Sequence, residues 1–149
     1  MAVMQKIKPF LWFNDQAEDA ARFYTSVFKS SKVVATSKGP DGKVMVVEFE
    51  LDGERFVALN GGPKFKFTEA ISFVILCDTQ EEIDFFWDNL TSGGGAPGQC
   101  GWLKDKYGLS WQVVPSNIAE LASDPKVMDA VMKMTKLDKA AMERAHRGV

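Results

Sequence analysis

Hydrophobic and polar residues follow two different periods along this chain, and these periods divide it into predicted strands and helices. A period of two predicts a strand, because successive side chains of a strand point to opposite faces. Apolar residues three or four positions apart predict the buried stripe of a helix. Strands are predicted at residues 7–13, 33–36, 44–51, 54–60, 71–77 and on both sides of a turn at 105–108.

Two amphipathic helices are predicted, one after the strand at 7–13 and one after the strand at 71–77. Asn14 or Asp15 is expected to cap the first helix, and Thr79 with Glu82 forms a capping box for the second. The stripes expected to be buried are Ala17, Ala20, Tyr24, Val27 and Phe28 in the first helix, and Ile83, Phe86, Trp87 and Leu90 in the second.

The segment after the last predicted strand, about residues 116–146, is predicted to be helical. Asp124 followed by Pro125 is typical of a helix start, and Asp138 is expected to cap a last short helix. The methionines of this segment suit an adaptable surface. They pack either on the sheet of the same chain, which we favour, or against a partner subunit.

The most distinctive stretch of the sequence is residues 100–114, which is predicted to form two strands joined by a charged turn. Gly108 suits a tight reversal because glycine accepts a positive φ. After the turn, the alternation places Trp111 and Gln112 on opposite faces of the strand. Gln112 points either into a cavity, where its amide can bind a ligand, or to a structural partner on a neighbouring strand.

The chain contains an internal repeat at an offset of 63 residues. Phe10 matches Phe73, and Asp15 matches Asp78, so that apolar and capping positions recur together. Further along, residues 56–59 are best matched to residues 110–113.

Each half therefore reads as a strand, a helix and three further strands. One such half leaves an apolar sheet face uncovered, whereas two halves can form a shared cavity. We predict an α+β fold of two βαβββ modules with curved mixed sheets in a single domain, residues 1–149. Module one spans about 5–62 and module two about 70–115. The alternative is an ordinary α+β sheet with a chance similarity between its halves.

Composition and charge exclude several partners. The formal net charge is −2, whereas nucleic-acid binders usually carry a basic excess. No apolar run approaches the roughly 20 residues of a membrane span, and the first residues lack the apolar core of a signal peptide. We therefore expect a cytoplasmic protein without a nucleic-acid or membrane partner.

Metal and thiol chemistry has little support in the sequence. His146 is the only histidine, whereas zinc, iron and copper sites usually take several imidazole ligands. The two cysteines, Cys77 and Cys100, are each placed in a strand-like stretch and expected to be reduced. Cys100 is either a nucleophile, for which no histidine base is at hand, or a small buried residue.

Two segments resemble a known family. Residues 9–14 (Pro-Phe-Leu-Trp-Phe-Asn), with the Ala-Glu pair at 17–18 and the Phe-Tyr pair at 23–24, resemble the opening of PhnB-like proteins, and residues 100–115 resemble their most distinctive block. This group belongs to the glyoxalase/bleomycin-resistance/dioxygenase (vicinal oxygen chelate) superfamily and often carries the label 3-demethylubiquinone-9 3-methyltransferase. The resemblance covers roughly residues 5–146. It implies paired βαβββ modules, a homodimer and a cup-shaped site in each curved sheet.

The resemblance also implies four positions at which metal-dependent members of the superfamily hold their metal. They fall on Lys8 or Pro9, Ala58, Ser72 and Gln112, and none of these is His, Asp or Glu. We therefore expect no metal and no cofactor. The methyltransferase label is not expected to describe the chemistry either, since no strand is followed by the Gly-rich turn of an S-adenosylmethionine-binding domain.

The predicted function is the binding of a small, partly apolar organic ligand in a metal-free cavity. The alternative is an enzyme of the same superfamily, a lyase, isomerase or dioxygenase. Charged residues near the hairpins, including Asp105, Glu48 and Glu50, are interpreted as solvated. The candidate ligand-binding residues are Gln112, Trp12, Phe10, Phe56, Trp102, Trp111 and Cys100.

Overall fold

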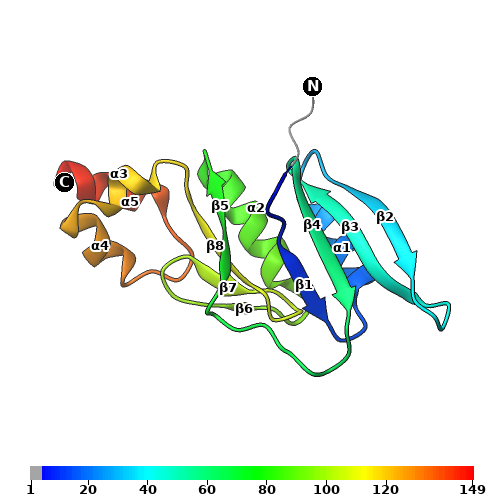
Figure 1. Ribbon diagram of the computed structural model, residues 1–149. Helices are drawn as coiled ribbons and strands as arrows, with labels where there is room; N and C mark the ends of the chain where they lie inside the picture. The colour runs from blue at the N-terminus through cyan, green and yellow to red at the C-terminus, as the bar shows by residue number, and fades with distance from the viewer. Residues whose placement is uncertain (1–4) are drawn as a thin grey trace. The chain divides into compact units, whose positions relative to one another are not determined.

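Two four-stranded mixed sheets, each with a long helix, account for most of the chain (Figure 1). The computed structural model describes residues 5–149, and the chain divides into Met1–Lys66 (unit 1) and Phe67–Val149 (unit 2). The strand orders are β1-β4-β3-β2 in unit 1 and β5-β8-β7-β6 in unit 2. The same order in both confirms the predicted α+β fold of two βαβββ modules.

Unit 1 begins with the strand and helix that the sequence predicted. It consists of β1 (Phe10–Phe13), α1 (Ala17–Val27), β2 (Lys32–Lys38), β3 (Val44–Leu51) and β4 (Glu54–Asn60). The predicted caps of α1, Asn14 and Asp15, are wrong, because the helix starts after Gln16 without a side-chain cap. Instead, the backbone N–H of Ala17 donates to Oδ1 of Asn60 at 2.8 Å. The end of β4 therefore fixes the start of the helix.

The core of unit 1 lies between α1 and one face of its sheet. Tyr24 of α1 stacks on Phe49 of β3 with ring centroids 6.1 Å apart, and Phe49 stacks on Phe56 of β4 at 5.4 Å. All three side chains are buried. Phe56, a candidate ligand-binding residue, is thus a core residue on the helix-covered face.

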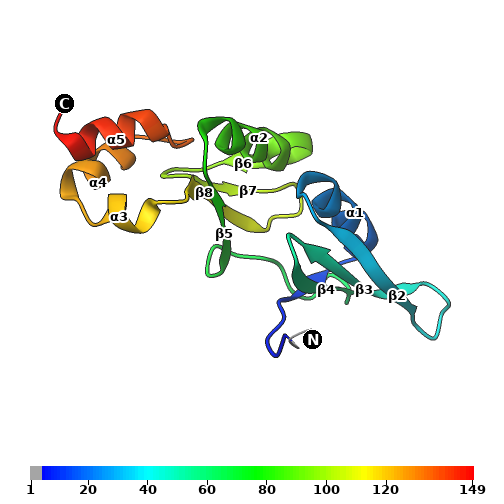
Figure 2. The same ribbon diagram turned by 90° about the horizontal axis from the view of Figure 1, so that it is seen from above.

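Unit 2 repeats the arrangement with shorter strands. It consists of β5 (Ser72–Cys77), α2 (Gln80–Thr91), a 3-10 turn η1 (Ser92–Gly94), β6 (Ala96–Pro97), β7 (Trp102–Lys104) and β8 (Ser110–Pro115). Thr79 caps α2 as predicted, since its side chain accepts the N–H of Glu82 at 3.2 Å. Figure 2 shows α2 over one side of the sheet, and its buried residues include Trp87 and Leu90.

The repeat has two offsets rather than one. The helices start 63 residues apart, at Ala17 and Gln80. The strands match at 64, because Leu11 pairs with Ala58 in unit 1 as Ile75 pairs with Val113 in unit 2. The strand-to-helix connection is therefore one residue shorter in unit 2.

This register corrects the predicted match of residues 56–59 with 110–113, which shifts to 111–114. The counterpart of Gln112 is consequently Val57 and not Ala58. Ala58 lies on the helix-covered face and is fully buried.

The C-terminal segment forms three short helices that pack on their own unit. They are α3 (Ile118–Ala122), α4 (Pro125–Val131) and α5 (Lys139–Arg147), and Figure 1 shows them gathered together. Asp124 and Asp138 cap α4 and α5 as predicted. Their apolar residues enclose Val114 of β8 in one cluster, so the helices cover that end of the sheet. No helix among residues 5–149 is long and apolar enough to cross a membrane.

Candidate functional site

The sheet of unit 2 presents a mixed polar and apolar surface on the face opposite α2, which we call the distal face. Residues paired across neighbouring strands share a face, so the register defines it. One row contains Val74, Gln112 and Trp102, and the next contains Ser72, Ser110 and Lys104. Leu76 continues the apolar side along β5, next to Val114.

A hydroxyl and amide group occupy the middle of the distal face. Nε2 of Gln112 donates to Oγ of Ser72 at 3.0 Å, which is the structural partner that the sequence left open for Gln112. This bond engages the amide nitrogen, and the amide oxygen can still accept a hydrogen bond. Ser110 is only 1% exposed, and among the described residues its Oγ has no hydrogen-bond partner.

Apolar groups flank this polar centre. Trp102 is half-buried and lies directly across from Gln112 on β7. On β5, Val74 is 52% exposed and Leu76 is 58% exposed. Large exposed aliphatic side chains beside a few polar groups are typical of surfaces that bind organic molecules.

The turn before β8 is held by a buried carboxylate, which corrects the expectation that Asp105 is solvated. Asp105 is 3% exposed. Its carboxylate accepts the backbone N–H of Tyr107 at 2.9 Å, that of Leu109 at 3.1 Å and the indole Nε1–H of Trp111 at 2.9 Å. Trp111 is therefore a core residue on the helix side, and the register separates it from the surface that carries Gln112.

Cys100 lies in the turn before β7 rather than in a strand. Its backbone has a φ of 61°, and its N–H donates to the carbonyl of Met134 at 2.8 Å. Its Sγ is 3.8 Å from Sδ of Met132, and the residue packs beside the C-terminal cluster. These contacts assign Cys100 to the packing of the C-terminal segment.

The other cysteine, Cys77, is fully buried. Burial, followed by the nearby carboxylates of Glu82 and Asp78, raises the pKa of its thiol to about 12. This agrees with the inert role expected for it, because a thiol is reactive as the thiolate.

In unit 1 the face opposite α1 is occupied by charges that satisfy one another. Glu48 accepts hydrogen bonds from Lys8 at 3.1 Å and from Arg55 at 3.4 Å, and Arg55 also binds Glu50 at 3.1 Å. The pairing with Lys8, ahead of Arg55, holds the pKa of Glu48 below its usual value. Glu48 and Glu50 are half-buried members of this network, not the solvated residues expected.

Two candidate aromatics lie on the same face of unit 1. Phe10 is exposed at the start of β1. Trp12 donates its indole N–H to the carbonyl of Gly62 at 2.9 Å and meets Phe65 edge to face at 4.8 Å. Trp12 is therefore held in place at the end of its strand.

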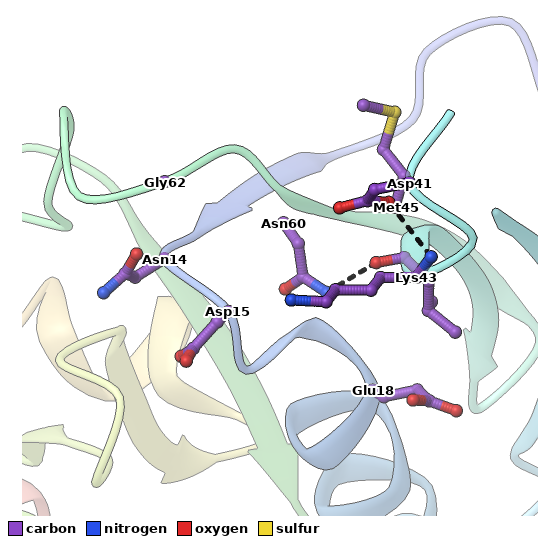
Figure 3. A pocket seen from close by; sticks show the side chains of 9 residues that line it. Asn14, Asp15, Glu18, Asp41, Lys43, Met45, Asn60 and Gly62 are labelled. Carbon is purple, nitrogen blue, oxygen red and sulfur yellow. Dashed lines mark hydrogen bonds between the residues drawn. The ribbon is translucent and has the colours of Figure 1, made fainter. Parts of the chain in front are cut away.

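A separate open hollow of about 420 Å³ lies at the other end of unit 1 (Figure 3). Its walls are Asn14, Asp15, Glu18, Asp41, Lys43, Val44, Met45, Asn60 and Gly62. Asn60 already uses both ends of its amide, toward Ala17 and the carbonyl of Val44. None of the candidate residues lies in this hollow, which sequence reasoning did not identify.

The residues at the metal positions of the superfamily do not fit a metal. The register places these positions at Lys8, Val57, Ser72 and Gln112, with Val57 replacing Ala58. A cation, an apolar side chain, a hydroxyl and an amide form a poor donor set for a divalent transition metal. Within the part of the chain that the structure describes, no three His, Cys, Asp or Glu residues gather as metal ligands.

A sequence model of the family described as 3-demethylubiquinone-9 3-methyltransferase matches residues 5–114. The chain belongs to this family. Among solved structures, it is similar to a Bacillus cereus PhnB protein described as a candidate 3-demethylubiquinone-9 3-methyltransferase. That protein is 36% identical, with a TM-score of 0.68 over 74% of this chain and 99% of the other.

Two more distant structures show the fold of the 3-demethylubiquinone-9 3-methyltransferase family member described above. Protein PA1353 from Pseudomonas aeruginosa is 16% identical, with a TM-score of 0.63 over 75% of this chain and 98% of the other. The fosfomycin resistance protein FosX from Listeria monocytogenes is 14% identical, with a TM-score of 0.56 over 80% and 97%. The family and these neighbours confirm the glyoxalase/bleomycin-resistance superfamily. A search of curated proteins gave no match.

The family name implies S-adenosylmethionine, and the connections between strand and helix do not fit it. Phosphate or nucleoside groups are usually held at a Gly-rich turn between a strand and a helix. Here β1 leads to α1 through residues 14–16, and β5 leads to α2 through residues 78–79, and neither connection contains glycine.

Proposed function

We propose that this family member binds a small organic molecule on the distal face of unit 2 without a metal. The observation that carries the proposal is the combination of Gln112 and Ser72 with Trp102 and two exposed aliphatic side chains. A ligand with one oxygen-bearing end and one apolar body would match both halves of this surface.

Unit 1 supports the choice of unit 2 by contrast. Its equivalent positions carry Lys8, Arg55 and Glu48, which are bound to one another. A ligand there would have to break charged hydrogen bonds, which contribute about 1.5–3 kcal/mol each. On the distal face, the hydroxyl and amide groups would gain hydrogen bonds instead.

A thermal-shift screen of small aromatic and aliphatic molecules on chelator-treated protein tests the proposal. A ligand present at about one hundred times its Kd stabilises the native state by about 2.7 kcal/mol. Gln112→Ala should abolish most of the shift, whereas Gln99→Ala, an exposed residue of the preceding loop, should retain it. Ligands that shift both variants equally would show that they bind elsewhere.

The competing possibility is a metal-dependent enzyme of the same superfamily. Elemental analysis of the purified protein distinguishes the two. We expect less than stoichiometric zinc, iron, nickel and manganese, and no loss of ligand binding after chelation. One bound metal per chain, together with an activity that a chelator removes, would refute the metal-free proposal.

We further propose that the protein is a cytoplasmic homodimer, as its resemblance to the superfamily implies. Light scattering at micromolar concentration should give about twice the chain mass of 16.5 kDa. A mass equal to one chain over the whole concentration range would contradict the dimer.

A further inference from the structure

The distal face contains a buried hydroxyl that the fold itself does not use. Ser110 is 1% exposed, and its Oγ has no hydrogen-bond partner within residues 5–149. A buried polar group without a partner is costly and therefore uncommon in native proteins. Its position beside the Gln112–Ser72 pair makes it part of the polar end of the distal face.

An ion pair lies across this hydroxyl. In the register, Ser110 has Lys104 of β7 on one side and Ser72 of β5 on the other. Nζ of Lys104 pairs with the carboxylate of Glu69, which precedes β5. The pair therefore spans the strand at Ser110, from the β7 side to the β5 side.

The pair is an exposed one. The side chains of Lys104 and Glu69 are 47% and 60% exposed, and the hydrogen bond from Lys104 lowers the pKa of Glu69. Exposed ion pairs of this kind contribute little to stability and are readily exchanged. Glu69 can therefore leave Lys104 at small cost when another anion takes its place.

We infer that the ligand carries a carboxylate, which replaces Glu69 on Lys104 and accepts a hydrogen bond from Ser110, while its apolar body lies over Trp102. This inference rests on the proposed function and adds the chemical class of the ligand. It gives Ser110 a partner, and it explains why hydrogen-bond donors, and not carboxylates, occupy the row of Ser72, Ser110 and Lys104.

Charge balance selects a carboxylate over other polar groups. Lys104 carries one positive charge, and Glu69 already neutralises it with one negative charge. Exchange of one carboxylate for another keeps this balance. A neutral amide would leave Lys104 on Glu69, and a doubly charged group would bring a second negative charge that no neighbour in the row neutralises.

Two probes of the same size test the inference, naphthalene-2-carboxylate and naphthalene-2-carboxamide. Their dissociation constants are measured by isothermal titration calorimetry at pH 7.5 and low salt. We expect the wild-type protein to bind the carboxylate about tenfold more tightly, since hydrogen bonds to charged groups are about twice as strong as neutral ones. Lys104→Met should remove this preference, and Lys133→Met, which changes an exposed cation of the C-terminal segment, should keep it.

Glu69→Gln provides the second and opposite signal. Because it removes the competing carboxylate, it should tighten binding of naphthalene-2-carboxylate about threefold and leave the carboxamide unchanged. Equal affinity for the two probes in the wild type, or a preference that survives Lys104→Met, would overturn the inference and leave the proposed binding intact. Failure of both probes to bind any variant at millimolar concentration would overturn both.

Discussion

Replacement of Asp105 by alanine is expected to destabilise unit 2 strongly, although the residue belongs to a short charged turn. Asp105 is 3% exposed. Its carboxylate accepts two backbone N–H groups and the indole N–H of Trp111, all between 2.9 and 3.1 Å. Alanine removes all three acceptor contacts and offers none in their place.

The magnitude follows from these contacts. A hydrogen bond to a charged group contributes about 1.5–3 kcal/mol, and a buried donor that loses its acceptor costs about 1–3 kcal/mol. The three bonds share one carboxylate and are not independent. We therefore expect Asp105→Ala to lower the free energy of unfolding by about 3–5 kcal/mol, a large part of the about 5–15 kcal/mol of a typical domain.

Urea denaturation followed by tryptophan fluorescence measures this loss. Asp105→Asn should cost less, about 1–3 kcal/mol, because the amide keeps one acceptor oxygen but turns an N–H₂ group toward another donor. Asp88→Ala, an exposed residue of α2, serves as the control and should change stability by less than about 0.5 kcal/mol. A loss below about 1 kcal/mol for Asp105→Ala would refute the role assigned to this carboxylate.

Three further changes test other parts of the structure. Ser110→Ala should raise the free energy of unfolding of the ligand-free protein by about 1 kcal/mol, because it removes a buried hydroxyl without a partner; a loss measured by urea denaturation would contradict this. Lys8→Met should weaken the dependence of stability on acid pH. The hydrogen bond from Lys8 lowers the folded-state pKa of Glu48, so this pair stabilises the protein above the ordinary glutamate pKa, and the stabilisation is lost as pH falls through the lower folded value. Identical acid-unfolding curves for the two proteins would exclude that contribution. Gly61→Ala should cost about 1–3 kcal/mol, since its Cβ would lie 2.4 Å from the Trp12 ring; a melting temperature equal to that of the wild type would contradict the close contact.

The period of the sequence was sufficient to predict the fold but not its register. The helix stripes, such as Tyr24 and Trp87, recur at 63 residues and are strong signals. The strands recur at 64, because one residue is missing from the second strand-to-helix connection. A short strand with apolar residues on both faces, such as β1, does not reveal a shift of one residue, and so Ala58 was matched to Gln112 in place of Val57.

The candidate site was predicted in part for the same reason. Alternation correctly separated Gln112 from Trp111, but aromatic residues alone do not tell a core face from a surface face. Phe56 and Trp111 lie in the cores, whereas Trp102 lies on the distal face. Asp105 was missed because its contact with Trp111 depends on how the turn folds back, which no local pattern encodes.

The two units show how a duplicated module can keep one fold and lose one binding surface. The equivalent positions in units 1 and 2 are Lys8 and Ser72, Arg55 and Ser110, Glu48 and Trp102, and Glu50 and Lys104. In unit 1 they bind one another through ion pairs, which satisfies their charges within the fold. In unit 2 the same backbone positions hold a hydroxyl without a partner, a half-buried indole and a cation whose only printed partner is the exposed Glu69. Because the backbone pairing is the same in both, the difference lies in the side chains alone, and they leave unit 2 with hydrogen-bonding capacity that only a further molecule can use.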